Sequence, residues 1–274
     1  MMKKISIKLA FMICVLLVSC QPKKTQTAQD ASFLISNISD SASKTEVMND
    51  LQQVISAKSV ARFFAAVEDY NDTIKCTSLT KGFVDVAPEY DVAKISELWK
   101  KAKGLYIGTN CRITAFTLLG DSIQIPSGEY DDALLFLDND AIVQGGLFTE
   151  EETARFRQLF SRVPTDKTTD VRVHAEKMQD YFSQFAFNSK AKMFSVVLHD
   201  NLDGDYLFVG HIGVLVENAS GFLFIEKLSF EEPYQAVKFK TVQDCVRYLQ
   251  VKYEHYHDEE TAKPFVMING KYTE

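Results

Sequence analysis

Cysteine is scarce in this chain of 274 residues, which contains five. Two of them, Cys14 and Cys20, lie near the N-terminus, so Cys76, Cys111 and Cys245 are left for the rest of the sequence. Three cysteines are too few for the disulfide framework that stabilises small secreted domains. A disulfide between Cys76 and Cys245 would leave Cys111 free, whereas full reduction would leave three free thiols, and the sequence is compatible with both.

Basic side chains are outnumbered as well. There are 30 lysines and arginines against 37 aspartates and glutamates, which gives a formal net charge of −7. No stretch has the clustered basic residues that follow a nucleic-acid backbone, and the overall field repels phosphate. Nucleic acid is therefore excluded as a partner. Internal repeats are absent too, so the main part of the chain is expected to form a single domain.

The first 19 residues have the pattern of an export signal. Three lysines within the first eight residues precede an apolar run at 9–18, which is too short for a stable transmembrane helix. The run ends in Leu17-Val18-Ser19-Cys20, which resembles the lipobox of bacterial lipoproteins. That resemblance implies cleavage before Cys20, lipidation of its thiol and anchoring at the extracytoplasmic face of the cell membrane. Otherwise residues 1–19 are an ordinary signal peptide and Cys20 is incidental.

Residues 20–42 are rich in Lys, Thr, Gln, Ser and Asp. A segment of this composition cannot bury enough apolar surface to fold, so it is expected to be a flexible tether. Cleavage before Cys20 removes three lysines and no acidic residue, which changes the formal charge from −7 to −10. The folded domain is expected to span residues 43–274.

The first part of this domain has helical periodicity. Ser43 and Glu46 have the spacing of a capping box, and the helix that follows places Val47 and Leu51 on one face. Apolar spacing and cap signals predict further helices at 59–70, 92–103, 111–119, 130–143, 150–160 and 171–187.

After residue 190 the period changes to that of strands. Strands are predicted at 193–198, 206–216, 221–228, 234–239 and 265–269, with one more helix at 241–253. Consecutive strands joined by short turns pair in antiparallel fashion. The expected fold is therefore α+β, helical over 43–190 and an antiparallel sheet over 191–274.

Cys111 is a candidate nucleophile. Asn110 can cap the helix that Cys111 begins, and the first turn of a helix favours a thiolate through its free N–H groups and dipole. Arg112 adds positive charge nearby. The alternative is a small core residue, because Cys111, Ala115 and Leu118 share one helix face.

His211 and Glu226 are its candidate partners. His211 interrupts a very apolar strand, where an imidazole gains nothing by burial without a partner, although a core histidine with one hydrogen bond is the alternative. If residues 217–220 form a four-residue loop, Val216 pairs with Gly221 and His211 lies opposite Glu226. Opposed side chains point to the same face with Cβ atoms about 5 Å apart, whereas a slip of one residue would turn Glu226 away.

The residues around Cys111, His211 and Glu226 resemble the motifs of a known superfamily. A cysteine at a helix start, a His-Ile-Gly-Val strand and a polar residue on the next strand resemble the papain-like NlpC superfamily of cell-wall peptidases and amidases. The resemblance implies a papain-like sheet in which Cys111 is the nucleophile, His211 the base and Glu226 the orienting residue. Residues 128–187 would then be a helical insertion. Asn110 and Arg112 stand where that superfamily has Asp and Ser.

The whole chain is also similar to an uncharacterised family of bacterial lipoproteins that share an Asn-Cys-Arg segment and a Phe-Ile-Glu-Lys-Leu-Ser-Phe-Glu-Glu-Pro segment. That similarity implies no activity. The expected function is a membrane-anchored cysteine amidase or peptidase that acts on peptidoglycan peptides and needs no cofactor or metal. The alternative is a non-catalytic surface lipoprotein that binds a peptide or a protein.

Two other polar groups of residues are weaker candidates. His255, His257 and Asp258 have donor atoms for a metal ion, but their hydrophilic segment is typical of a solvated loop. Three arginines at 155, 157 and 162 would bind a substrate carboxylate if they faced a cleft, and are otherwise ordinary surface charge.

Overall fold

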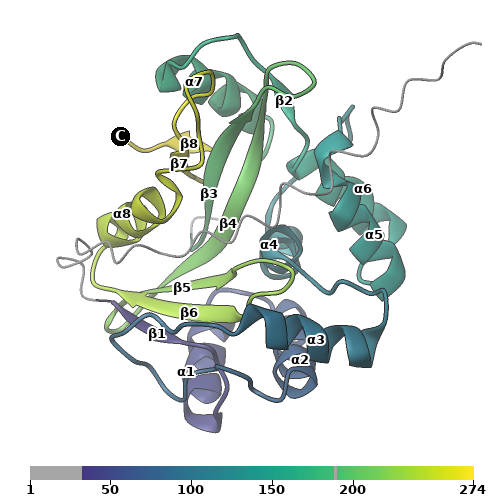
Figure 1. Cartoon of the computed structure of the whole chain (residues 1–274). Coiled ribbons are helices and arrows are strands. Elements are labelled where there is room, and N and C mark those ends of the chain that lie inside the picture. Colours follow the sequence, from purple (N-terminus) through teal and green to yellow (C-terminus); the bar gives the residue numbers. More distant parts are fainter. Residues whose placement is uncertain (1–32, 188–189) are drawn as a thin grey trace, which may run out of the picture. The chain divides into compact units, whose positions relative to one another are not determined.

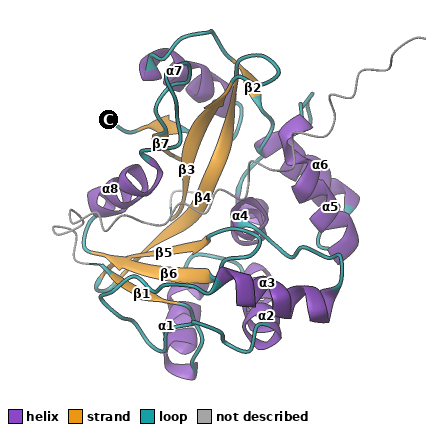
Figure 2. Cartoon of the chain, viewed as in Figure 1, coloured by secondary structure: helices purple, strands orange, loops and turns teal. Residues whose placement is uncertain are grey.

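The computed structural model describes residues 33–187 and 190–274, which form an α+β domain. The predicted fold class is confirmed: eight strands form one antiparallel sheet, and helices pack against both of its faces (Figures 1 and 2). The predicted signal peptide at 1–19, Cys20 and the first part of the predicted tether lie outside the described residues.

Seven strands form the continuous path of the sheet and one pairs at its side. In spatial order the path is β1 (Leu34–Ser36), β6 (Tyr234–Phe239), β5 (Gly221–Lys227), β4 (Tyr206–Asn218), β3 (Ala191–Asp200), β7 (Phe265–Ile268) and β8 (Lys271–Tyr272). The short β2 (Val163–Pro164) pairs with β4 off this path.

Two of these strands correct the predicted boundaries. β1 lies in the segment assigned to the tether, so the folded domain begins before residue 43, and β2 shows that the sheet is not confined to 191–274. Both strands are too short to show the alternation that identifies a strand in a sequence. Their pairing with β6 and β4 stabilises them.

The helices lie in two layers. They are α1 (Ser41–Gln52), α2 (Ala57–Thr73), α3 (Val92–Lys103), α4 (Cys111–Leu119), α5 (Phe136–Gly145), α6 (Glu150–Leu159), α7 (Val171–Phe182) and α8 (Val242–Tyr253). One face of the sheet is covered by α8, whose Cys245 and Leu249 share an apolar cluster with Phe194 and Leu215. Buried residues of the other seven helices belong to the larger cluster against the opposite face.

Side-chain caps fix where helices begin. Asn110 accepts the Ile113 N–H at 3.0 Å through Oδ1, which starts α4 at Cys111 as predicted. The capping box predicted at Ser43 is wrong. Asp40 caps α1 instead and accepts the N–H groups of Ala42 and Ser43, so this helix starts earlier.

The β4–β5 hairpin is tighter than predicted. Pairing extends from Gly213–Glu226 to Asn218–Gly221, so only residues 219 and 220 form the turn. Asn218 Oδ1 accepts the Ser220 N–H at 2.9 Å, and Gly221 has a φ of 136° that suits glycine. The predicted opposition of His211 and Glu226 is therefore wrong by two residues. A shift of two keeps side chains on the same face, so both still point to the same side.

Beyond Gly213 the strands β4 and β5 diverge. β5 continues beside β6, whereas β4 continues beside β3 and then β2. Figure 1 shows α4 beside β4 at this opening. Gly210 adds a bulge to β4 just before His211, because Val196 pairs with His211 while Val197 pairs with Val209. The opening lets a residue of α4 reach an imidazole on β4.

Candidate active site

Cys111 and His211 meet in the structure. The Cys111 thiol and the His211 imidazole lie close enough for each to shift the pKa of the other, although α4 packs in the larger core and His211 lies against Tyr253 of α8 on the opposite face. The divergence of β4 and β5 brings them together. Both are buried, with 6% of Cys111 and 2% of His211 exposed.

Glu226 binds one nitrogen of the His211 ring. His211 Nε2 lies 2.6 Å from Glu226 Oε2, and Glu226 has no exposed surface. His211 and Glu226 contact each other diagonally across the strands, because Glu226 pairs with Gly213 and not with His211. Position 213 has no room for a side chain, since a Cβ atom there would collide with the Phe224 ring. Sequence reasoning therefore named three residues that are linked in space.

Two residues of α8 hold the Glu226 carboxylate from the other side. Tyr248 donates its hydroxyl to Oε1 at 2.7 Å, and Lys252 Nζ lies 3.1 Å from both carboxylate oxygens. Lys252 also donates to the Tyr248 hydroxyl at 3.0 Å. Sequence reasoning missed both residues. Their spacing of four places them on one helix face, but nothing local indicates that this face meets Glu226.

The electrostatics favour a charged pair. Burial alone would raise the pKa of the Cys111 thiol, but the charge and hydrogen bond of His211, with help from Arg112, lower it below its ordinary value. Burial opposes the charged imidazole as well, yet Cys111 and Glu226 raise the pKa of His211. The pKa of Glu226 is lowered to about 2, because Lys252 and His211 outweigh its burial. The arrangement supports a thiolate beside an imidazolium.

A buried carboxylate that sequence reasoning missed fixes the nucleophile segment. Asp138 of α5 accepts two bonds from Arg112, from Nε at 3.0 Å and from Nη2 at 2.6 Å, and one from Asn110 Nδ2 at 2.8 Å. Arg112 Nη1 also donates to the Val209 carbonyl at 2.9 Å, two residues before His211. Arg112 thereby joins the helix of the thiol to the strand of the imidazole.

The N-terminus of α4 supplies donors near the sulfur. The first N–H groups of a helix have no partner within it, and Asn110 satisfies that of Ile113. The N–H of Cys111 itself is therefore suited to hold a negative oxygen that develops on a carbonyl attacked by the thiolate. An arrangement of this kind could support acyl transfer, with the thiol as nucleophile, the imidazole as base, the carboxylate as orienting group and the helix N–H as oxyanion donor.

The surroundings cover the site. Tyr253, the last residue of α8, stacks on the His211 ring with centroids 4.9 Å apart and an interplanar angle of 24°. The β5–β6 loop is held by the buried Lys227 ammonium, which donates to the Ser229 and Phe230 carbonyls at 2.7 and 3.3 Å. With 6% of Cys111 exposed, the thiol is shielded in the folded protein.

The remaining candidates have structural surroundings. Cys76, Cys111 and Cys245 are all free, so the disulfide alternative does not apply. Within residues 33–187 and 190–274 no group of three His, Cys, Asp or Glu side chains is placed to hold a metal ion. The three arginines bind neighbouring groups of the protein: Arg155 the Ile123 carbonyl, Arg157 Asn139 and Arg162 Asp131.

Comparison with known proteins gives a family but no activity. Among the described residues, no helix is long and apolar enough to span a membrane. No curated protein and no solved structure matches the chain. One family model matches residues 34–273, and it is described only as a domain of unknown function. The chain therefore belongs to the DUF4300 family.

Proposed function

We propose that the protein is a papain-like cysteine hydrolase that cleaves amide bonds in peptides. The observation that carries the proposal is the linkage of Cys111, His211 and Glu226, in which a thiol of lowered pKa contacts an imidazole held by a carboxylate. A structural histidine would be satisfied by one partner, whereas this ring is held by Glu226 through Nε2 and also interacts with the Cys111 thiol. The α+β class is compatible with such an enzyme.

The reaction follows from the positions of these groups. The Cys111 thiolate attacks the amide carbonyl carbon, and the N–H groups at the start of α4 stabilise the resulting oxyanion. The His211 imidazolium protonates the amine as the C–N bond breaks, which leaves a thioester on Cys111. His211, now neutral, then removes a proton from water, which attacks the thioester; the C–S bond breaks to release a carboxylic acid and regenerate the Cys111 thiolate beside the His211 imidazolium. Glu226 orients the ring and stabilises it in the steps in which it is charged.

The location and the substrate rest on the sequence. The lipobox-like segment ending at Cys20 supports a lipid-anchored protein on the extracytoplasmic face, and the motif around Cys111 and His211 resembles that of NlpC-type peptidases. The amide polymer accessible there is peptidoglycan. The proposed substrates are therefore its stem peptides.

Two measurements on purified protein test the proposal. Cys76 is exposed, so alkylation is measured in a Cys76→Ser background, with the modified residue identified by mass spectrometry. Cys111 is expected to react with iodoacetamide at neutral pH with an apparent pKa below the ordinary value of about 8.5. Muropeptides are then digested by this protein and by its Cys111→Ala variant. Equal product from the two proteins would refute the mechanism.

The second candidate is a non-catalytic lipoprotein that binds a peptide or a protein. The burial of Cys111 and the stacking of Tyr253 over His211 favour this alternative. It predicts that Cys111 reacts with iodoacetamide only after unfolding. The alkylation rate of the folded protein therefore distinguishes the two functions.

A further inference from the structure

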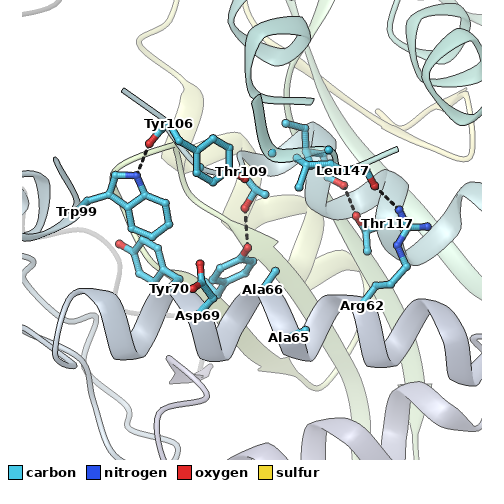
Figure 3. A pocket seen from close by; sticks show the side chains of 15 residues that line it. Arg62, Ala65, Ala66, Asp69, Tyr70, Trp99, Tyr106, Thr109, Thr117 and Leu147 are labelled. Atoms are coloured by element: carbon cyan, nitrogen blue, oxygen red, sulfur yellow. Dashed lines mark hydrogen bonds between the residues drawn. The ribbon is translucent and has the colours of Figure 1, made fainter. Parts of the chain in front are cut away.

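A second concave site lies between α2, α3 and α4. It has a volume of about 390 Å³ and is lined partly by Gly108 and Thr109, just before Cys111 (Figure 3). Cys111, His211 and Glu226 are not among its lining residues. Its volume is that of a small-molecule site.

Aromatic rings form one wall of this pocket. The Trp99 ring lies 5.6 Å from that of Tyr70 and 6.2 Å from that of Tyr106, measured between centroids. Trp99 Nε1 donates to the Tyr106 carbonyl at 2.7 Å, and a Cβ atom at Gly108 would lie only 2.9 Å from the indole. The wall is thus fixed before any ligand binds.

The two ends of the pocket carry side chains of opposite charge. Arg62 and Asp69 are seven residues apart on α2, which is about 10 Å along a helix with a rise of about 1.5 Å per residue. Figure 3 shows both on the pocket side of α2, with the small Ala65 and Ala66 between them. The floor between the charges is therefore open.

Both charged groups keep bonding capacity. Among the described residues, Arg62 gives one N–H group to Glu152 and one to the Leu147 carbonyl, and a guanidinium has five. Asp69 uses Oδ1 for the Lys103 ammonium, which leaves Oδ2. Lys103 Nζ also lies 5.6 Å from the Trp99 ring centroid, so this end already accommodates a cation.

We infer that this pocket binds a short peptide with free termini, about three residues long. Its amine would lie between Asp69 and Trp99, and its carboxylate would bind Arg62. An extended chain spans about 3.3–3.6 Å per residue, so three residues match the separation of Arg62 and Asp69 along α2. Binding does not depend on Cys111, and the site therefore stands or falls separately from the proposed hydrolase.

Trp99 makes the test specific, because it is the one tryptophan of the sequence. Trialanine is titrated into the full-length protein while tryptophan fluorescence is recorded, and calorimetry gives an independent dissociation constant. Saturable binding is expected, with the Cys111→Ala variant unchanged. N-acetyl-trialanine and trialanine amide should each bind at least about fivefold more weakly, since each loses one charged hydrogen-bonding end.

Substitutions in the pocket test which end of the peptide each charged residue binds. Asp69→Asn should weaken binding of trialanine but not of N-acetyl-trialanine, whereas Asp72→Asn, an exposed change on the same helix, should leave both constants unchanged. Lys103→Gln should tighten binding of trialanine, because it removes the internal cation. Absence of saturable binding up to about 10 mM, or equal constants for free and blocked peptides, would overturn the inference.

Discussion

Arg112 and Asp138 form a bidentate ion pair in which the carboxylate is completely buried and also accepts a bond from Asn110. The Asp138→Asn variant leaves the Arg112 charge without its partner and weakens the cap of α4. Removing one member of a buried pair costs about 3–5 kcal/mol. We expect this loss in urea unfolding. Asp140→Asn, an exposed change on the same helix, should stay within about 0.5 kcal/mol of the parent protein.

The Glu226→Gln variant should impair the linked Cys111, His211 and Glu226 group while keeping a side chain of the same size at position 226. Without the carboxylate charge the pKa of His211 falls, so the imidazolium stabilises the Cys111 thiolate less and the pKa of the thiol rises. The pH at which Cys111 alkylation is half-maximal should therefore move upward, and amide hydrolysis should fall by about 10²-fold or more. The control is Glu217→Gln at an exposed position of β4. An unchanged pH profile would show that Glu226 does not act through His211.

Tyr253→Ala should open the site. The ring stacks on His211, so its removal gives reagents a path to the sulfur. The alkylation rate of Cys111 should rise several-fold at a pH where the thiol is fully ionised, which separates access from ionisation. Tyr256→Ala, which removes a ring that is 60% exposed, provides the comparison. Equal rates in all three proteins would show that Tyr253 does not limit access.

Asp40 should make stability depend on acid pH. Its pKa is lowered to about 2 by the side-chain bond from Ser43 and by the backbone N–H groups of Gly82, Ser43 and Ala42. The stabilisation is complete above the ordinary value of 3.8 and is lost as the pH falls through about 2. Asp40→Ala should cost about 1 kcal/mol at pH 7 and progressively less below pH 4. Urea midpoints of both proteins across this range measure the difference.

Lys227 should make the stability of the fold depend on pH above neutrality. Burial lowers its pKa from 10.5 to about 7, so between these values the unfolded chain binds more protons than the folded one. The free energy of unfolding should therefore rise with pH from about 7 to 10.5. Lys227→Met should lack this part of the rise, by up to about 1.4 kcal/mol per pH unit. Parallel pH curves for the two proteins would contradict the prediction.

Local signals predicted the elements that carry the site. The bounds of α3, α4 and β6 agree with the predicted ranges because caps and apolar spacing are encoded within each segment. The contact of His211 with Glu226 was also accessible, since strand alternation places side chains on a face even when the register is two residues off.

The residues that support the site, by contrast, could not be predicted from local sequence signals. Asp138 and Lys252 belong to the site only through their contacts with Arg112 and Glu226, and in each pair the two residues are 26 positions apart along the chain. A lone acid on α5 or a lysine on α8 is indistinguishable in the sequence from a solvated charge. Only the packing of α5 beside α4, and of α8 across the sheet, makes them part of the site.

The divergence of β4 and β5 also has a consequence for synthesis. The sulfur comes from residue 111, its base from residue 211, and the groups that charge the base from Glu226 and Lys252. A ribosome makes these parts in that order. The pKa of the thiol therefore stays at its ordinary value until β4, which carries His211, has been made and has folded beside α4.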